Sequence, residues 1–261
     1  MADIKAVFFD IDGTLVPFGE RGMRPETAEA LHRLRAGGIK VFINSGRPKY
    51  YMTNLGDFPF DGYVCMNGGL LLLDGKVVWS RPIDREDALA VIRVSDRNGL
   101  SCVAFGLDSF KLNFHSRKEI ELSRMLGIDM DSVGPLEPLI ESGEDIYEFT
   151  VFADREEEKL FHFPVTKHLI FPRWNDGFMD VDPDSTSKAD GLRMMASAMG
   201  IAVSQTMAFG DGGNDISMLS AAGIGVAMGN ASPEVQAHAS YTTSSDTENG
   251  IPAALRHFGL I

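Results

Sequence analysis

The sequence has little of several features that assign a protein to a class at once. Its 261 residues include only two cysteines, Cys65 and Cys102, and both stand in apolar surroundings. This usage indicates buried thiols in a reducing compartment. No stretch approaches the roughly 18 uninterrupted apolar residues of a membrane span, so the sequence predicts no transmembrane helix. The first residues lead into a strand without the basic segment and cleavage site of a signal peptide. We therefore expect a cytoplasmic protein.

Basic residues are outnumbered as well. The chain has 24 lysines and arginines against 37 aspartates and glutamates, which gives a formal net charge of -13. Nucleic acids and anionic membranes attract basic patches, so neither is an expected partner. A small phosphorylated metabolite is compatible with this charge, because its site needs only a few local cations or a metal ion. The sequence gives no indication of the oligomeric state.

Three common ligand-binding signatures are missing. None of the six histidines pair at the spacing of zinc ligands, and the two cysteines stand far apart, so a zinc site is not expected. The chain has no P-loop. Residues 223–229 are rich in glycine, but the glycines straddle an expected strand rather than follow one, which argues against a dinucleotide-binding loop.

The first strand ends in a pair of acids. Residues 6–9 form a continuous apolar run, which is typical of a buried strand in a parallel sheet. Asp10 and Asp12 follow, and side chains two residues apart point to the same side of an extended chain. Gly13 allows a sharp turn there. A solvated turn can have the same residues, whereas a calcium loop is not expected because residues 14–19 lack its oxygen donors.

Strands and helices alternate near both ends of the sequence. The N-terminal part predicts a helix at 24–38, strands at 39–43 and 63–66, and a hairpin of strands at 70–73 and 77–79. The C-terminal part predicts a helix at 187–199, a strand at 206–209, a short helix to 222, a strand at 224–228 and a last helix from 248. This alternation favours a parallel sheet with right-handed crossovers.

The middle of the chain follows another pattern. We expect helices at 84–98, 117–126 and 155–161, and strands at 101–105, 111–114, 146–152, 168–171 and 178–181, before a link at 182–184. Such a set predicts a small α+β module with an antiparallel sheet. The predicted fold class is therefore α/β. A Rossmann-like core with a parallel sheet flanked by helices comprises residues 1–82 and 183–261, and an α+β domain of residues 83–182 is inserted into it.

Two further segments near predicted strand ends could bind an anion. Ser45 and Gly46 follow the second strand, and a hydroxyl with backbone amides at a helix start forms an anion site. Alternatively, residues 44–45 only cap a helix that begins at Pro48. Lys188 stands in a first helical turn, where the helix dipole prefers acids. Most lysines in such places are simply solvated.

The segment 210–215 gives the sharpest signal. It follows a predicted strand and combines Asp211, Asn214 and Asp215 with three glycines. Carboxylate and amide oxygens in such a cluster suit Mg2+, which prefers hard oxygen ligands. A turn built from turn-forming residues is the alternative, although a turn does not require three such groups.

Taken in order, these segments resemble the four motifs of the haloacid dehalogenase-like hydrolases. The motifs are residues 10–14, Ser45, Lys188 and residues 210–215. The insert of about a hundred residues between the second and third motifs is similar to the α/β cap (C2-type) of the Cof-type subfamily. The resemblance spans the chain, with one departure at Asn44, where the family pattern has a smaller residue.

The resemblance implies a role for each matched residue. Asp10 would be the nucleophile that forms an aspartyl-phosphate, and Asp12 the general acid and base. The implied metal ligands are the Asp10 carboxylate, the Asp12 carbonyl and Asp211, with Asp215 holding a metal-bound water. The implied groups that bind the phosphoryl oxygens are Ser45, the Gly46 amide, Lys188 and Asn214.

The function implied is that of a Mg2+-dependent phosphatase acting on small phosphorylated metabolites, with sugar phosphates as the expected class. The cap would contact the leaving group, with Arg173, Trp174, Asn175 and Asp176 as candidates unless they form only an exposed loop. A phosphomutase that uses the same aspartyl-phosphate is an alternative function. A regulatory phosphometabolite-binding protein without turnover is another, although such a protein has no need of a general acid at Asp12.

Overall fold

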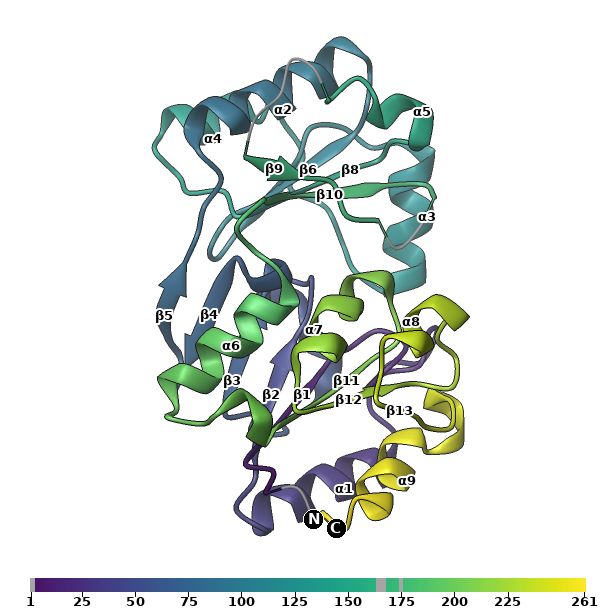
Figure 1. Ribbon diagram of the computed structural model, residues 1–261. Coiled ribbons are helices and arrows are strands. Elements are labelled where there is room, and N and C mark those ends of the chain that lie inside the picture. Colours follow the sequence, from purple (N-terminus) through teal and green to yellow (C-terminus); the bar gives the residue numbers. More distant parts are fainter. Residues whose placement is uncertain (1–2, 163–167, 174–175) are drawn as a thin grey trace. The chain divides into compact units, whose positions relative to one another are not determined.

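The computed structural model describes residues 3–162, 168–173 and 176–261. The chain divides into two compact units (Figure 1). One comprises Met1–Trp79 and Ser187–Ile261, and the other comprises Ser80–Thr186. Among the helices of the described residues, none has the length and apolar character needed to cross a membrane.

The first unit contains an eight-stranded sheet in the order β13-β12-β11-β1-β2-β3-β4-β5. Its strands are β1 (Ala6–Phe9), β2 (Lys40–Asn44), β3 (Gly62–Cys65), β4 (Leu70–Leu73), β5 (Lys76–Ser80), β11 (Thr206–Gly210), β12 (Ile224–Ala227) and β13 (Tyr241–Thr242). β1 runs parallel to its neighbours β2 and β11, whereas β4 is antiparallel to β3. The predicted α/β class is confirmed, with the hairpin making the sheet mixed rather than wholly parallel.

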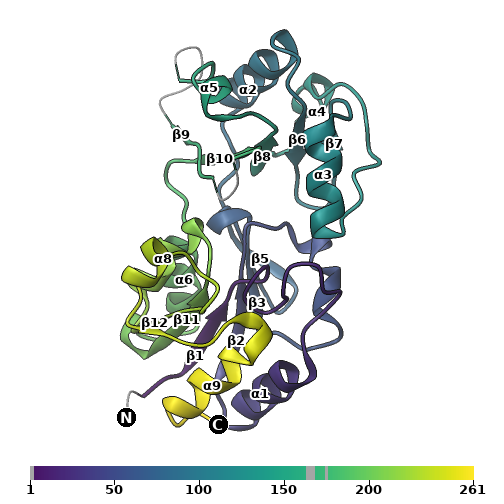
Figure 2. The same cartoon turned by 90° about the vertical axis from the view of Figure 1, so that its right-hand side faces the viewer.

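Helices cover both faces of this sheet, which explains the apolar run of β1. They are α1 (Pro25–Ala36), α6 (Lys188–Ala198), α7 (Ile216–Ala221), α8 (Pro233–Ala237) and α9 (Gly250–His257). Figure 2 shows α6 and α8 on one side of β1 and α1 and α9 on the other. All four residues of β1 are buried. Phe8 stacks on Phe42 on one face, and Phe9 stacks on Phe209 on the other. A strand buried on both faces has no polar alternation.

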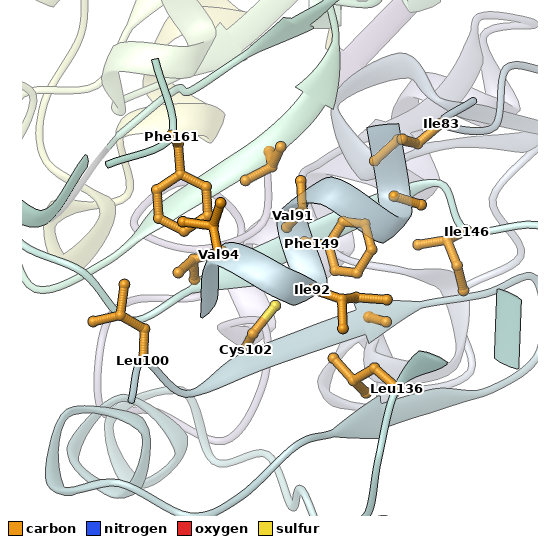
Figure 3. Packing of buried hydrophobic residues seen from close by; sticks show 14 of the residues in the cluster. Ile83, Val91, Ile92, Val94, Leu100, Cys102, Leu136, Ile146, Phe149 and Phe161 are labelled. Carbon is orange, nitrogen blue, oxygen red and sulfur yellow. The ribbon is translucent and has the colours of Figure 1, made fainter. Parts of the chain in front are cut away.

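The second unit contains a five-stranded sheet in the order β7-β6-β8-β10-β9. Its elements are α2 (Arg85–Arg97), β6 (Cys102–Phe105), β7 (Phe110–Leu112), α3 (Arg117–Leu126), α4 (Glu137–Glu141), β8 (Glu148–Val151), α5 (Arg155–Glu158), β9 (Leu169–Ile170) and β10 (Met179–Pro183). Neighbouring strands of this sheet pair antiparallel, as predicted. Figure 3 shows the core of this unit, where Val91 and Ile92 of α2 pack with Phe149 and Cys102 of the sheet.

The other face of this second sheet carries buried polar groups. Strand pairing places Val103, Thr150 and Asp180 side by side on that face, and it pairs Glu148 with Phe105. Glu148, Thr150 and Asp180 are all buried. The Thr150 hydroxyl donates to the Asp180 carboxylate at 2.9 Å. The sheet therefore has one apolar face against α2 and one face with acidic groups.

Several local expectations differ from the structure. Asp182 and Pro183, predicted as a link, belong to β10, where Pro183 takes the last position and pairs with Leu169 of β9. The short elements α4, α8 and β13 were not predicted, because segments of two to five residues carry too little periodicity. Lys49–Tyr51 forms a 3-10 turn rather than a helix from Pro48.

Candidate active site

The candidate site lies in the first unit, at the carboxyl ends of β1 and β11. Phe9 pairs with Phe209 in the parallel ladder, and the Asp10 N–H donates to the Phe209 carbonyl at 3.0 Å. The chain turns away from β11 immediately afterwards, at Asp211. Ligands of open α/β sheets bind in the crevice outside such strand ends.

Three aspartates meet at this edge. Carboxylate oxygens of Asp10, Asp211 and Asp215 all lie within 4.8 Å of one another, and within the described part of the chain they form the metal-compatible acidic group. Asp10 and Asp215 are buried, with 7% and 0% of their surface exposed. Asp211 is partly buried beside them, and burial of adjacent acids is unfavourable unless cations balance them. The cluster is typical of Mg2+ binding, because it offers hard oxygen donors.

Lys188 supplies one cation to the cluster. Its ammonium donates to Asp10 Oδ1 and to Asp215 Oδ1, each at 2.6 Å. The Lys188 side chain is only 1% exposed, so the alternative of a solvated lysine is wrong. Asn44, the residue that departs from the family pattern, donates from its side chain to the Lys188 carbonyl at 2.8 Å. Asn44 thereby ties β2 to the start of α6.

Asp215 shapes the loop that follows β11. Its Oδ2 accepts hydrogen bonds from the backbone N–H groups of Asp211 and Gly212, both at 2.9 Å. A Cβ at Gly210 would lie 2.5 Å from Asp215 Cβ. Gly13 has a φ of +77°, and a Cβ there would collide with Asp211 Oδ2. Gly13 therefore allows the β1 loop to approach the β11 loop, and Gly210 allows Asp215 to pack against the end of its own strand.

Burial changes the protonation of this cluster. It raises the pKa of Asp10 to about 7, with further contributions from Asp215 and Asp12 and an opposing one from Lys188. Burial also raises the pKa of Asp211 to about 8, assisted by Asp10 and Asp215. Burial lowers the pKa of Lys188, but the two adjacent carboxylates outweigh it and raise that pKa above the ordinary value. A bound cation would favour the ionised carboxylates.

Asp12 points to a different partner from Asp10. Arg47 donates from Nε to Asp12 Oδ2 at 2.6 Å and from Nη2 to Asp12 Oδ1 at 2.7 Å. The guanidinium also donates from Nη1 to the Tyr51 carbonyl at 3.0 Å. The two acids of the first motif are therefore held differently, one by a lysine and one by an arginine.

Ser45, Gly46 and Asn214 gather around a residue that the sequence did not single out, Asn67. A Cβ on Gly46 would lie 3.3 Å from Asn67 Oδ1, and Asn214 Nδ2 donates to that oxygen at 3.1 Å. The Ser45 hydroxyl accepts a hydrogen bond from the Arg47 N–H at 3.2 Å. A 3-10 turn at Lys49–Tyr51, without a side-chain cap, stands in place of the helix expected from Pro48. The alternative that residues 44–45 only cap that helix is therefore wrong. Asn67 has a φ of +49°, a conformation that asparagine tolerates better than most residues. The sequence signal that could have identified Asn67 is its position after a predicted strand and before two glycines.

Two other residues of the site were not predicted from the sequence. Thr14 Oγ1 donates to Asp211 Oδ1 at 2.8 Å. Asn230 Nδ2 donates to the Gly13 carbonyl at 2.8 Å and to Asp211 Oδ2 at 3.3 Å. Thr14 stands inside the first motif, but Asn230 has no motif around it. Asn230 enters the site only because the fold brings the loop after β12 next to the loop after β1.

The haloacid dehalogenase-like hydrolase family model matches residues 7–255. The chain belongs to the haloacid dehalogenase-like hydrolases. The match covers both units and all four motifs. The predicted family and enzyme class, a phosphoric monoester hydrolase, are confirmed, while the roles of individual residues stay predictions.

Solved structures of the family agree with the fold. The subclass IIB sugar phosphatase BT4131 is 35% identical, with a TM-score of 0.91 over 98% of this chain and 100% of that one. The phosphatase BT1666 from Bacteroides thetaiotaomicron is 33% identical, with a TM-score of 0.89 over 99% and 96% of the chains. In a comparison of sequences, the 5-amino-6-(5-phospho-D-ribitylamino)uracil phosphatase YbjI of Escherichia coli is 27% identical over 95% of this chain and 93% of that protein.

The structure describes two of the four candidate leaving-group contacts, Arg173 and Asp176, and this role stays a prediction for all four. Trp174 and Asn175 lie outside the described residues. The Arg173 side chain is 7% exposed and donates to Glu158 at 2.6 Å and to the carbonyls of Ala153 and Phe178 at 2.8 Å. These bonds hold the guanidinium within the second unit.

Proposed function

We propose that the protein is a Mg2+-dependent phosphatase of small phosphorylated metabolites, with sugar phosphates as the substrate class. The observation that carries this proposal is the contact of Asp10, at the end of the central strand, with Lys188 and with the acidic cluster of Asp211 and Asp215. Residues 1–82 and 183–261 would form the catalytic domain, and residues 83–182 the cap. The free, buried thiols of Cys65 and Cys102 support a cytoplasmic location.

Asp10 would act as the nucleophile. Lys188 holds Oδ1 of its carboxylate, which leaves Oδ2 to attack phosphorus. The new O–P bond gives an aspartyl-phosphate, and the ester oxygen leaves with a proton from Asp12. In the second half, a water molecule gives its proton to Asp12 and attacks the same phosphorus. Phosphate leaves and the Asp10 carboxylate is restored.

The acidic cluster fits a divalent cation. With all three carboxylates ionised, the charges of Asp10, Asp211, Asp215 and Lys188 sum to about -2. The Asp10 and Asp211 carboxylates and the Asp12 carbonyl would be the direct ligands. Asp215 would bind through a water, because its oxygens already accept three hydrogen bonds. Mg2+ would neutralise charge on the transferring phosphoryl group.

The phosphoryl oxygens would be bound beside Asp10. Ser45, the Gly46 amide, Lys188 and Asn214 are the proposed donors. Asn67 is close to Gly46 and accepts a hydrogen bond from Asn214, so it would help to orient these two. Donors fixed in advance stabilise developing charge without reorganising during the reaction. The known sugar phosphatase at 35% identity supports the substrate class.

A substrate panel tests the proposal. Purified protein is incubated with sugar phosphates, nucleotides and cofactor phosphates, in Mg2+ and in EDTA, and phosphate release is measured. We expect release with at least one class of ester, strongest with sugar phosphates, and only in Mg2+. Absence of release across the panel would contradict a phosphatase. An isomerised phosphate ester formed without phosphate release would indicate a phosphomutase instead.

A further inference from the structure

Thr14 offers a buried hydroxyl to one of the proposed metal ligands. Its Oγ1 donates to Asp211 Oδ1 at 2.8 Å, across 197 positions of the sequence. Only 2% of the Thr14 surface is exposed, so water has little access to this hydroxyl. In the described part of the chain, the Asp211 carboxylate accepts from one other side chain, that of Asn230, at 3.3 Å and in an exposed position. Thr14 therefore supplies the shorter and better shielded of the two contacts.

The donor stands on a loop that is fixed by its own backbone. The Gly13 N–H donates to the Val16 carbonyl at 2.9 Å, and the Val16 N–H donates to the Ile11 carbonyl at 2.8 Å. The branched side chain of a threonine also restricts rotation about χ1, which limits the directions that its hydroxyl can take. The loop after β1 therefore defines the direction of the hydrogen bond to Asp211.

The acceptor stands on a loop with less local constraint. Glycines flank Asp211 at positions 210, 212 and 213, and glycine permits many backbone conformations. The backbone N–H of Asp211 donates to Asp215 Oδ2 at 2.9 Å, but this bond does not fix the direction of the Asp211 carboxylate. That direction depends on the two side-chain donors, of which Thr14 is the buried one.

We propose that Thr14 is a positioning residue, which holds the Asp211 carboxylate in the orientation that suits Mg2+ and thereby favours Mg2+ over Ca2+. The inference rests on the proposed Mg2+ site. Mg2+ requires near-ideal octahedral geometry, whereas Ca2+ accepts more oxygen ligands at longer and more variable distances and often takes both oxygens of one carboxylate. A carboxylate whose Oδ1 already accepts a hydrogen bond is less available for such two-oxygen binding. Groups that orient metal ligands typically contribute about 10- to 100-fold to metal affinity.

The role predicts a change in the ratio of two affinities. A hydrogen bond that only supported the fold, or only favoured the ionised form of Asp211, would affect Mg2+ and Ca2+ by the same factor, because both ions bind the same carboxylates. A hydrogen bond that orients Asp211 has a larger effect on Mg2+, which tolerates a displaced ligand less well. The ratio of the two dissociation constants therefore separates orientation of the ligand from general support of the site.

The test measures the dissociation constants of Mg2+ and of Ca2+ by isothermal titration of the metal-free protein at one fixed pH. Thr14→Val removes the hydroxyl and keeps the branched shape, whereas Thr14→Ser keeps the hydroxyl and loses the methyl group. Thr150→Val is the matched control, because Thr150 also donates a buried hydroxyl to an aspartate, Asp180, at 2.9 Å, but in the second unit. Thermal unfolding checks that each variant is folded.

For Thr14→Val we expect the affinity for Mg2+ to fall by about 10-fold or more and the affinity for Ca2+ by less than about 3-fold. Thr14→Ser should keep most of the preference for Mg2+, because its hydroxyl can still donate to Asp211. Thr14→Ala tests the same loss of the hydroxyl if Thr14→Val does not fold. Thr150→Val should leave both affinities unchanged.

The inference can fail while the proposed metal site stands. An equal loss of affinity for both ions in Thr14→Val would show that Thr14 supports the site without orienting Asp211. Unchanged affinities for both ions would show that the contact with Asp211 has no part in metal binding. The same selective loss in Thr14→Ser as in Thr14→Val would show that the hydroxyl is not responsible. If the unmodified protein binds neither ion, the proposed Mg2+ site fails and the inference fails with it.

Discussion

Lys188 is the residue on which the balance of charge in the acidic cluster depends. It is buried and donates to Asp10 and Asp215 at 2.6 Å each. Removing one partner of a buried ion pair leaves the other charge without compensation, which costs about 3–5 kcal/mol. The same lysine is proposed to bind the phosphoryl group. The effect of Lys188 on stability can be measured without substrate, and so separately from its effect on activity.

We expect Lys188→Met to lower the free energy of unfolding by about 3–5 kcal/mol in metal-free buffer. The matched control is Lys40→Met, because Lys40 also pairs with an aspartate, Asp61, at 2.9 Å but is 44% exposed. That variant should lose no more than about 1 kcal/mol. Urea unfolding measures both. Equal losses in the two variants would show that the cluster does not depend on Lys188.

The raised pKa values of Asp10 and Asp211 predict how stability changes with pH. Both exceed the ordinary value, reaching about 7 and about 8. A carboxyl whose pKa is higher in the folded state binds its proton more tightly there. Its stabilising contribution is therefore complete below about pH 4 and is lost as the pH rises through 7 and 8. Each unit of pKa difference corresponds to about 1.4 kcal/mol.

The free energy of unfolding of the metal-free protein should therefore fall by roughly a few kcal/mol between pH 5.5 and pH 8.5. Urea unfolding over this range measures the loss. Asp211→Asn should flatten the curve, and Mg2+ should stabilise the protein more at pH 8.5 than at pH 5.5, because it binds the ionised carboxylates. A metal-free stability that rises steadily over this range would contradict the raised pKa values.

At the level of the loops, the approach of the β1 and β11 loops depends on Gly13. Its φ of +77° and the collision of a Cβ at this position with Asp211 Oδ2 impose two separate costs on any other residue. Gly38 shares the first cost alone, with a φ of +82° and no atom within 4 Å of such a Cβ. Comparing substitutions at Gly13 and Gly38 therefore separates the cost of backbone strain from the effect of displacing Asp211.

We expect Gly13→Ala and Gly38→Ala each to lose about 1 kcal/mol or more in stability from the positive φ. Gly13→Ala alone should also weaken Mg2+ binding, because the new methyl group displaces Asp211. Isothermal titration with Mg2+ and urea unfolding measure the two effects. Unchanged Mg2+ affinity in Gly13→Ala would show that Asp211 is not where the metal binds.

The same loops show what the sequence could and could not predict. Asp10 and Asp211 were found because each follows a predicted strand, directly or after one glycine, and parallel strands end at one edge of a sheet. The contact of Arg47 with Asp12 was missed, since the two are 35 residues apart and no local pattern pairs them. Asn230 reaches Asp211 only through the crossover from β12. Pairings of this kind depend on the tertiary fold.

For the molecule as a whole, each unit has its own core. The second unit buries Phe149 and Val151 of its sheet against Val91 and Ile92 of α2 (Figure 3). All the residues of the candidate site belong to the first unit. Stability of the second unit and metal binding by the first should therefore respond to different substitutions.

We expect Phe149→Ala to destabilise the second unit by about 3–5 kcal/mol, because the side chain is wholly buried. Mg2+ affinity should change little. Calorimetric unfolding and Mg2+ titration measure the two properties, with Phe114→Ala, at a position that is 37% exposed, as the control. A large loss of Mg2+ affinity in Phe149→Ala would show that the metal site needs the second unit intact.

The proposed function depends above all on Asp10 attacking phosphorus in a Mg2+-dependent reaction. The deciding measurement is phosphate release from a sugar phosphate by the unmodified protein and by Asp10→Asn, each with Mg2+ and with EDTA. Thermal unfolding confirms that the variant is folded. We expect release by the unmodified protein in Mg2+ alone and none by Asp10→Asn. Mg2+-dependent phosphate release by a folded Asp10→Asn variant would show that Asp10 is not the nucleophile.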